Sequence, residues 1–347
     1  MRAARGSTAG RASGGSGGVY KALLTLLVVG AILLLSSGGS SGGSSSNLRS
    51  SSGRRKVETM LSAAGGGLRG AAGFAAVPPM LYGTAWKKER TASLVGKAIR
   101  AGFRGIDTAC QPKHYNEPAV GQAVEAAIAA GVVTRSQLFL QTKFTSLSGQ
   151  DPDNVPYDKD AATLDEQVRQ SLAASLRNLK TSYLDSWVLH SPMESFDRTL
   201  LVWREFEEAV RAGTVRSLGI SNCYELPTLK RLYEEAVVKP SFLQNRFYQK
   251  TGFDKDIRAF CKEKSIKYQT FWTLTANPDI LKSATVRGLA TKKKHTPEQI
   301  WFAFVLKSGM MFLTGTTSDE HMAEDLAVPS ISLTQDEFDS IDALLQE

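Results

Sequence analysis

Only three cysteines occur among the 347 residues, Cys110, Cys223 and Cys261, and they lie far apart in the chain. Three scattered thiols are too few for a disulfide framework, and they lack the close spacing of a metal site. The chain from Met80 onward also contains no Asn-X-Ser/Thr sequence, which is the acceptor for N-linked glycans. We therefore expect no metal, and we expect the folded part of the chain to lie in a reducing compartment.

Acidic residues are nearly absent from the first 79 residues, which hold nine Lys or Arg and a single Glu. The rest of the chain holds 33 basic and 33 acidic residues, so the whole net charge of +8 lies in this first segment. A protein that binds nucleic acid needs a basic surface on its folded part to follow the phosphates. The neutral remainder therefore argues against nucleic acid as a partner.

A long hydrophobic run is also lacking. The Gly/Ser-rich leader, residues 1–76, contains one apolar segment at 19–35, or only 22–35 if Lys21 is left out. At 1.5 Å per residue these runs cover about 26 Å or about 21 Å, against roughly 30 Å of hydrocarbon. The segment fits a marginal membrane anchor, a cleaved signal or an organelle-targeting leader, and basic residues on both sides leave its orientation open. We expect the leader to be disordered or membrane-bound, and to be dispensable for folding.

From residue 77 to residue 347 the sequence changes to short apolar runs that alternate with amphipathic segments, as in repeated βα units. Helical spacing is clearest in Leu164, Val168, Leu172 and Leu176. The sequence predicts strands at residues 80–82, 103–107, 138–142, 186–190, 217–220, 242–244, 266–271 and 311–314. Eight such units favour an α/β fold, a closed (β/α)8 TIM barrel of about 250 residues, with an open doubly wound sheet as the alternative.

Four residues that can hold or move a proton stand near the ends of predicted strands: Asp107, Tyr115, Lys143 and His190. In a barrel of parallel strands, these ends form the rim on which active sites are assembled. Together these four residue types make a proton-donating site. A tyrosine donates better when a nearby cation favours its phenolate form. We expect Lys143 to be that cation, Asp107 to hold the lysine, and a neutral His190 to orient the substrate.

Seven pieces of sequence occur in a characteristic order: GTAW at 83–86, GIDTA at 105–109 with YNE at 115–117, TK at 142–143, LHSP at 189–192, GISN at 219–222, Gln244, and GTTS at 315–318. In this order the chain resembles the aldo-keto reductases, from Met80 to Glu347. The resemblance implies a (β/α)8 barrel that reduces an aldehyde or ketone to an alcohol. It also implies NADP(H) as cofactor, with NAD(H) as a second option, a small-molecule carbonyl substrate and a monomer. A carbonyl that accepts hydride develops negative charge on oxygen, so it needs a proton donor and a polarising group.

The resemblance places cofactor contacts at the ends of several strands. Ser221, Asn222 and Gln244 would hold the nicotinamide carboxamide, and Phe271 would stack on the ring. The further contacts it implies are Thr84, Gly315, Thr316, Thr317 and His321. Family members that prefer NADPH hold its 2'-phosphate with a lysine and an arginine, where this chain has Gly315 and His321. We therefore expect weak discrimination between NADPH and NADH.

The tyrosine departs from the family pattern DTAxxYxNE, because this sequence reads DTACQPKHYNE. Counting forward from Asp107 puts Pro112 at the tyrosine position, whereas counting back from Asn-Glu puts His114 there. A lysine would disfavour the cationic form of a neighbouring imidazole. We therefore predict Tyr115 as the proton donor, with His114 as the alternative.

Large aromatic residues near the strand ends suggest the character of the substrate. Trp86 and Trp272, with Tyr115, are expected to line its pocket and to favour a hydrophobic aldehyde or ketone. The alternative function is a membrane-associated regulatory or scaffolding subunit that binds the nicotinamide cofactor, which the apolar segment of the leader motivates. The enzyme is the stronger hypothesis, because a scaffold does not require all four catalytic residue types.

Overall fold

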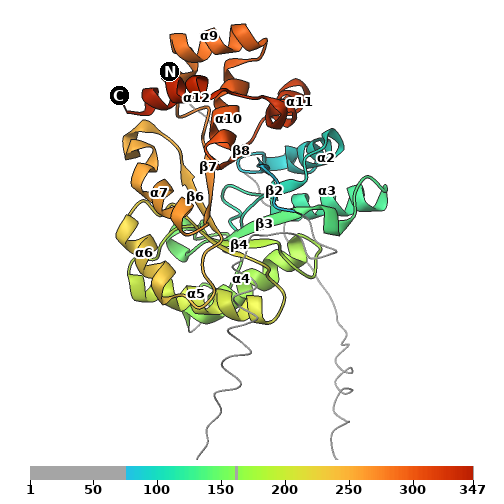
Figure 1. The fold of residues 1–347 in the computed structure, drawn as a ribbon. Helices are drawn as coiled ribbons and strands as arrows, with labels where there is room; N and C mark the ends of the chain where they lie inside the picture. Colours follow the sequence, from blue (N-terminus) through green and yellow to red (C-terminus); the bar gives the residue numbers. More distant parts are fainter. Residues whose placement is uncertain (1–75, 161–162, 347) are drawn as a thin grey trace, which may run out of the picture. The chain divides into compact units, whose positions relative to one another are not determined.

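The computed structural model describes residues 76–160 and 163–346, in which eight parallel strands close into one barrel (Figure 1). Neighbours in sequence are neighbours in the barrel, and the last strand pairs with the first. The strands are β1 Met80–Gly83, β2 Gly105–Asp107, β3 Phe139–Phe144, β4 Ser186–Leu189, β5 Leu218–Ser221, β6 Phe242–Arg246, β7 Lys267–Phe271 and β8 Met311–Thr314. Closure excludes the open doubly wound sheet.

Helices surround the strands (Figure 1). One α-helix follows each of the first six strands: α2 Thr91–Ala101, α3 Glu117–Ala129, α4 Leu164–Asn178, α5 Phe196–Arg211, α6 Leu226–Glu235 and α7 Lys255–Glu263. The last two strands are followed by α8 Pro278–Lys282, α9 Ala284–Lys293, α10 Pro297–Lys307, α11 Asp319–Ala327 and α12 Gln335–Asp342. Short 3-10 helices lie at Lys88–Arg90, Arg135–Gln137, Leu147–Gly149, Gln249–Asp254, Val328–Ser330 and Ala343–Leu345.

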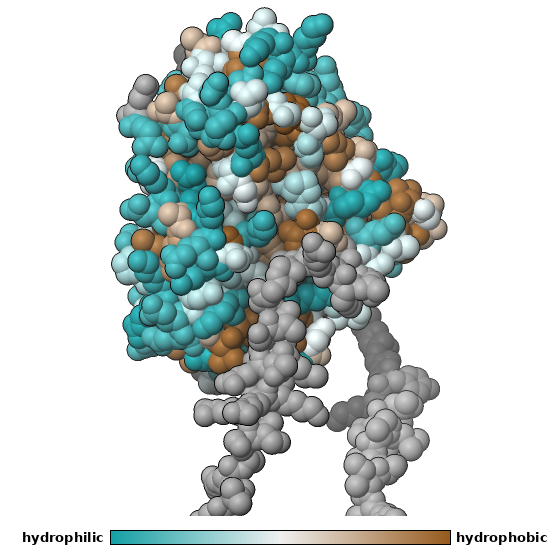
Figure 2. All heavy atoms as spheres, viewed as in Figure 1, coloured by the Kyte–Doolittle hydropathy of each residue, from teal (hydrophilic) through white to brown (hydrophobic). Residues whose placement is uncertain are grey.

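The main hydrophobic core lies between the strands and the helices. Trp187 of β4 stacks on Phe206 of α5 with ring centroids 3.8 Å apart, and Val168 of α4 is fully buried. The face shown in Figure 2 is mostly hydrophilic, with small separate hydrophobic patches. The helices therefore turn their apolar sides to the barrel, as their spacing of three and four predicts.

The barrel interior changes character from one end to the other. A small apolar cluster fills its amino-terminal end: Leu81, Phe139, Phe242 and Met311. Side chains alternate along a strand, so Phe139, Gln141 and Lys143 of β3 all point inward at successive levels. The interior is thus apolar at the base and polar toward the mouth, where Lys143 lies.

All eight predicted strands are present. Two of the boundaries that differ from the prediction have a clear physical reason. The second strand begins at Gly105 rather than at Phe103, because Phe103 packs in the outer core beside Tyr82. The third strand runs on to Phe144, because Lys143 and Phe144 pair with Val188 and Leu189 of β4. The strand therefore ends two residues later than predicted, and Lys143 lies near its end.

The predictions for the leader, including its apolar segment at 19–35, fall outside the described residues. None of the helices in the described part of the chain has the length and apolar character that a membrane span requires. All three cysteines are free and buried, as their scattered positions predicted.

Two helical glycines provide a matched test of the packing between α3 and α4. A methyl group on Gly121 would lie 2.0 Å from the carbonyl oxygen of Asn178, whereas one on Gly288 of α9 meets nothing within 4 Å. We expect Gly121→Ala to lower the free energy of unfolding by about 1–3 kcal/mol, through overpacking. Gly288→Ala should raise it by about 0.5–1 kcal/mol, since alanine favours the helix. Urea unfolding of both variants measures the difference, and equal effects would contradict the described contact.

Candidate active site

The centre of the site is a buried ion pair. The Lys143 ammonium lies 2.6 Å from Oδ2 of Asp107 and donates a second hydrogen bond, of 2.8 Å, to the Thr108 carbonyl oxygen. The lysine side chain is only 1% exposed. Burial lowers the pKa of Lys143, and the charge and hydrogen bond of Asp107 act against this by favouring the ammonium. The predicted partnership of these two residues is therefore present.

Asp107 is fixed from several directions. The backbone N–H and the hydroxyl of Thr84 both donate to the Asp107 carbonyl oxygen, each at 3.0 Å. The Oδ1 atom accepts from the side-chain amides of Gln141, at 2.7 Å, and Gln244, at 3.0 Å. Thr84 and Gln244, both predicted to contact cofactor, therefore hold Asp107 in this structure.

A single turn carries the tyrosine into the site. The backbone N–H groups of His114 and Tyr115 donate to the Gln111 carbonyl oxygen at 3.1 Å and 3.0 Å, and the Gln111 side chain donates to Gly149 at 2.6 Å. This sequence has two more residues between DTA and Asn-Glu than the family pattern, and the turn accommodates them. As a result the Tyr115 ring centroid lies 5.3 Å from the Lys143 ammonium and 6.0 Å from the His190 ring centroid.

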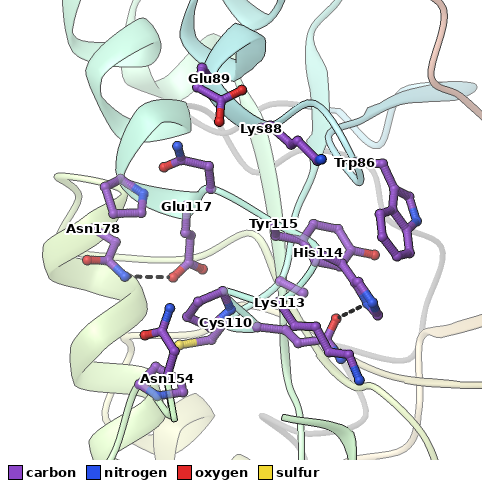
Figure 3. A pocket seen from close by; sticks show the side chains of 16 residues that line it. Trp86, Lys88, Glu89, Cys110, Lys113, His114, Tyr115, Glu117, Asn154 and Asn178 are labelled. Atoms are coloured by element: carbon purple, nitrogen blue, oxygen red, sulfur yellow. Dashed lines mark hydrogen bonds between the residues drawn. The ribbon is translucent and has the colours of Figure 1, made fainter. Parts of the chain in front are cut away.

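His114 points elsewhere. Its ring lies against Trp86, with centroids 4.0 Å apart, and its Nδ1 atom is 2.9 Å from Oε1 of Gln111. Figure 3 shows His114 beside Trp86, with its dashed hydrogen bond. Of the two candidate donors, Tyr115 is the one whose ring contacts with both Lys143 and His190 are found among the described residues, whereas His114 acts on His190 through its charge.

The expected effect of Lys143 on the tyrosine is not found. The pKa of Tyr115 is raised, first by burial and then by the negative charge of Asp107. The ammonium donates to Asp107 and Thr108 and lies 5.3 Å from the centroid of the tyrosine ring. Tyr115 therefore keeps its proton firmly in this structure.

His190 is electrically neutral, as predicted. Burial is the largest cause that lowers its pKa to about 3, and the positive charge of Lys143 adds to it. Its Nδ1 atom lies 2.6 Å from the Thr145 hydroxyl. When that hydroxyl donates to Nδ1, the neutral ring carries its one proton on Nε2, where it can act as a hydrogen-bond donor.

A cavity of about 500 Å³ opens beside the tyrosine turn. Figure 3 shows Trp86, His114 and Tyr115 on one side of it and Cys110 and Glu117 on the other. Trp272, predicted as a second pocket residue, does not line this cavity. Its indole is 52% exposed and lies under the Arg246 guanidinium, 4.0 Å from the ring centroid.

The remaining predicted nicotinamide contacts lie together at the ends of β5, β6 and β7. The Ser221 hydroxyl donates to the Gln244 carbonyl oxygen at 2.7 Å, and the Asn222 amide donates to the His190 carbonyl oxygen at 2.8 Å. Phe271 is half-buried at the end of β7, opposite Arg246 in register. Asn222 thereby connects the predicted cofactor residues to His190.

A model of the Aldo/keto reductase family matches residues 79–278. The chain belongs to this family. Membership makes it an NAD(P)H-dependent oxidoreductase, and the four catalytic residue types that the motifs predicted meet at the mouth of its barrel.

Three comparisons show how similar this reductase is to known members. A methylglyoxal reductase, DkgA of Salmonella typhimurium, is 28% identical over 273 residues, which cover 78% of this chain and 90% of that protein. An NAD/NADP-dependent indole-3-acetaldehyde reductase of Schizosaccharomyces pombe is 29% identical, covering 77% of this chain and 91% of that protein. The crystal structure of a Bombyx mori aldo-keto reductase in complex with NADP matches with a TM-score of 0.66 and 25% identity, covering 77% of this chain and 89% of that one.

The family's cofactor, NADP(H), fits the residues at the end of β8. Gly315 and Thr317 are exposed, Thr316 is half-buried, and the predicted contact His321 is exposed in the first turn of α11. The sequence analysis missed Lys87, whose ammonium donates to the Gly315 carbonyl oxygen from the loop after β1. A cation beside an open loop that leads into a helix N-terminus suits a phosphate group.

The neutral state of His190 predicts a loss of stability in acid. A histidine in the unfolded chain gains a proton near pH 6.5, whereas the folded pKa of His190 is about 3. Between these values the unfolded state binds more protons, so stability falls as the pH falls. From pH 7 to pH 5 this term amounts to about 2 kcal/mol. Urea unfolding should show that His190→Asn loses less stability over this interval than the unsubstituted protein; an equal loss in both would contradict a neutral His190.

Proposed function

We propose that this chain reduces a small aldehyde or ketone to an alcohol with NADPH, and that Tyr115 protonates the carbonyl oxygen. The observation that carries the proposal is the buried Lys143–Asp107 ion pair beside the Tyr115 ring, with His190 at the edge of that ring. A proton donor, a cation and a neutral hydrogen-bond donor are the groups that a developing alkoxide requires.

Each side chain has a distinct part in this reaction. The bound nicotinamide supplies hydride to the carbonyl carbon. Tyr115 keeps its proton at neutral pH because burial raises its pKa, and it can give that proton to an alkoxide, which is a stronger base than a phenolate. The Lys143 ammonium lies 5.3 Å from the Tyr115 ring centroid, and its charge favours the negative charge that develops on the reacting oxygens. The His190 Nε2–H group donates to the same carbonyl oxygen and fixes its orientation.

The aromatic residues around the mouth support a substrate with an apolar or flat part. Trp86 is 62% exposed, and together with His114 it forms an aromatic wall beside Tyr115. By their names, two relatives act on methylglyoxal, which is small, and on indole-3-acetaldehyde, which is aromatic. These two aldehydes are therefore the first substrates to assay, and the wall favours the aromatic one.

Replacing the tyrosine tests this function most simply. Tyr115→Phe removes only the hydroxyl, so we expect kcat to fall by about a hundredfold or more, the scale expected for loss of a general acid. The dissociation constant for NADPH, measured by fluorescence, should stay within about twofold because the ring and its packing remain. His114→Ala is the matched control and should retain most of the activity.

The opposite result has a clear meaning. If Tyr115→Phe keeps its turnover while His114→Ala loses it, the chain protonates its substrate through histidine. If the unsubstituted protein binds NADPH but reduces no carbonyl compound in a broad panel, the regulatory or scaffolding subunit is the better function. The membrane or organelle location that we propose from the segment at 19–35 is compatible with either activity.

We further expect only a modest preference for NADPH over NADH. Asp319 and Glu320 bring negative charge to the first turn of α11, and Lys97 pairs with Asp319 at 2.9 Å. Lys87 is the one cation described beside Gly315, and burial lowers its pKa. A single screened contact of this kind is worth about 1 kcal/mol, so NADPH should bind roughly fivefold to tenfold more tightly.

This preference should depend on pH and on Lys87. It should increase as the pH falls toward about 6, because burial lowers the pKa of Lys87 and a lower pH favours its ammonium form beside Gly315. Lys87→Met should bring the two dissociation constants close together, while Lys262→Met, on the exposed side of α7, should leave their ratio unchanged. A preference for NADPH above about a thousandfold, unchanged by pH and by Lys87→Met, would show that other residues hold the 2'-phosphate.

A further inference from the structure

Three glutamines form one polar layer across the inside of the barrel. They come from β3, β6 and β7, and each is at most 3% exposed: Gln141, Gln244 and Gln269. The amide nitrogens of Gln141 and Gln244 both donate to Oε1 of Gln269, at 2.8 Å and 2.9 Å. In return the Gln269 amide donates to Oε1 of Gln141 at 3.1 Å.

The layer is built around one acceptor. Oδ1 of Asp107 receives the second hydrogen bond of the Gln141 amide, at 2.7 Å, and that of the Gln244 amide, at 3.0 Å. Gln269 touches no catalytic group, but its oxygen aligns the two amides that do. The other carboxylate oxygen, Oδ2, is left to Lys143.

Burying three glutamine side chains inside the barrel costs free energy, and packing alone gives no reason for it. Branched aliphatic side chains usually fill the interior of a (β/α)8 barrel, and a buried amide is unfavourable unless it is hydrogen-bonded. The layer below this one, with Phe139 and Phe242, follows that rule. The glutamine layer lies at the height of Asp107, and two of its amides donate hydrogen bonds to this residue. The layer is therefore connected to the site at the barrel mouth.

We propose that Gln141, Gln244 and Gln269 are positioning residues that hold Asp107 as an anion aimed at Lys143. They act through the carboxylate: two amides donate hydrogen bonds to Oδ1 and orient it, so that Oδ2 keeps the ammonium beside the Tyr115 ring. This inference deepens the proposed reduction and rests on it. It also gives the Gln244 side chain a task inside the barrel, where both of its described side-chain hydrogen bonds lie.

Other ionisable groups around the carboxylate are few. Lys143 comes from β3, Tyr115 from the turn after β2, His190 from the end of β4 and Glu117 from the start of α3. His190 is neutral, and Glu117 bonds to Thr142 and Asn178 on the outer side of the strands. Lys143 and the two glutamine amides are therefore the groups that stabilise the negative charge.

The test uses two variants that remove an amide and keep the volume, Gln141→Met and Gln269→Met. Loss of the Gln141 donor, or of the Gln269 oxygen that aligns the two donors, weakens the hydrogen bonds to Oδ1, so the 13C carboxyl resonance of Asp107, assigned with Asp107→Asn, should change its chemical shift at pH 7. For the same reason kcat should fall by about tenfold. The KM for methylglyoxal and the dissociation constant for NADPH should change less than about twofold.

The matched control is Gln167→Met, a buried glutamine of α4 whose side chain has no hydrogen bond among the described contacts. It should keep the Asp107 resonance and the turnover of the unsubstituted protein. An Asp107 resonance that is unchanged in both layer variants would overturn the inference, and so would a parallel weakening of NADPH binding and kcat, because that pattern indicates general damage. The resonance does not require turnover, so it separates failure of this inference from failure of the proposed reduction.

Discussion

The ion pair between Lys143 and Asp107 is the interaction on which the rest of the site depends. Two charges withdrawn from water are costly unless each finds close partners. Here the ammonium has the carboxylate and the Thr108 carbonyl oxygen, and the carboxylate has the ammonium and two glutamine amides. The pair brings a fixed positive charge to the barrel mouth, where it helps to keep His190 neutral. The barrel supplies the rigidity, because both residues belong to paired neighbouring strands.

Local patterns in the sequence were sufficient to predict the strands of the barrel. The alternation of short apolar runs with helical periodicity predicted all eight strands, and the closed barrel follows from pairing β8 with β1. The order of the motifs predicted which side chains would meet, since Asp107, Lys143 and His190 each stand at or near the end of a strand. What the sequence could not give was the exact end of β3, because that depends on pairing with β4.

Contacts between distant segments account for what sequence reasoning missed. Gln141 and Gln269 are 128 residues apart, and Lys87 and Gly315 are 228 residues apart. A signal for the glutamine layer was nevertheless present, because Gln141 precedes Lys143 by two residues and so must share its inward face. The position of the tyrosine is a similar case. The turn from Gln111 to Tyr115 is held by hydrogen bonds that cannot be read from the spacing of residues in a motif.

The most direct measurement of the central claim is a double-mutant cycle on kcat for Asp107→Asn and Lys143→Met, with NADPH and the best aldehyde found. If the two residues act as one unit, each single substitution lowers kcat by about a hundredfold or more. The double variant should then be no slower than the slower single one, because the second substitution removes a group that has already lost its partner. Losses that multiply in the double variant would show that the two residues act independently, which would contradict this account.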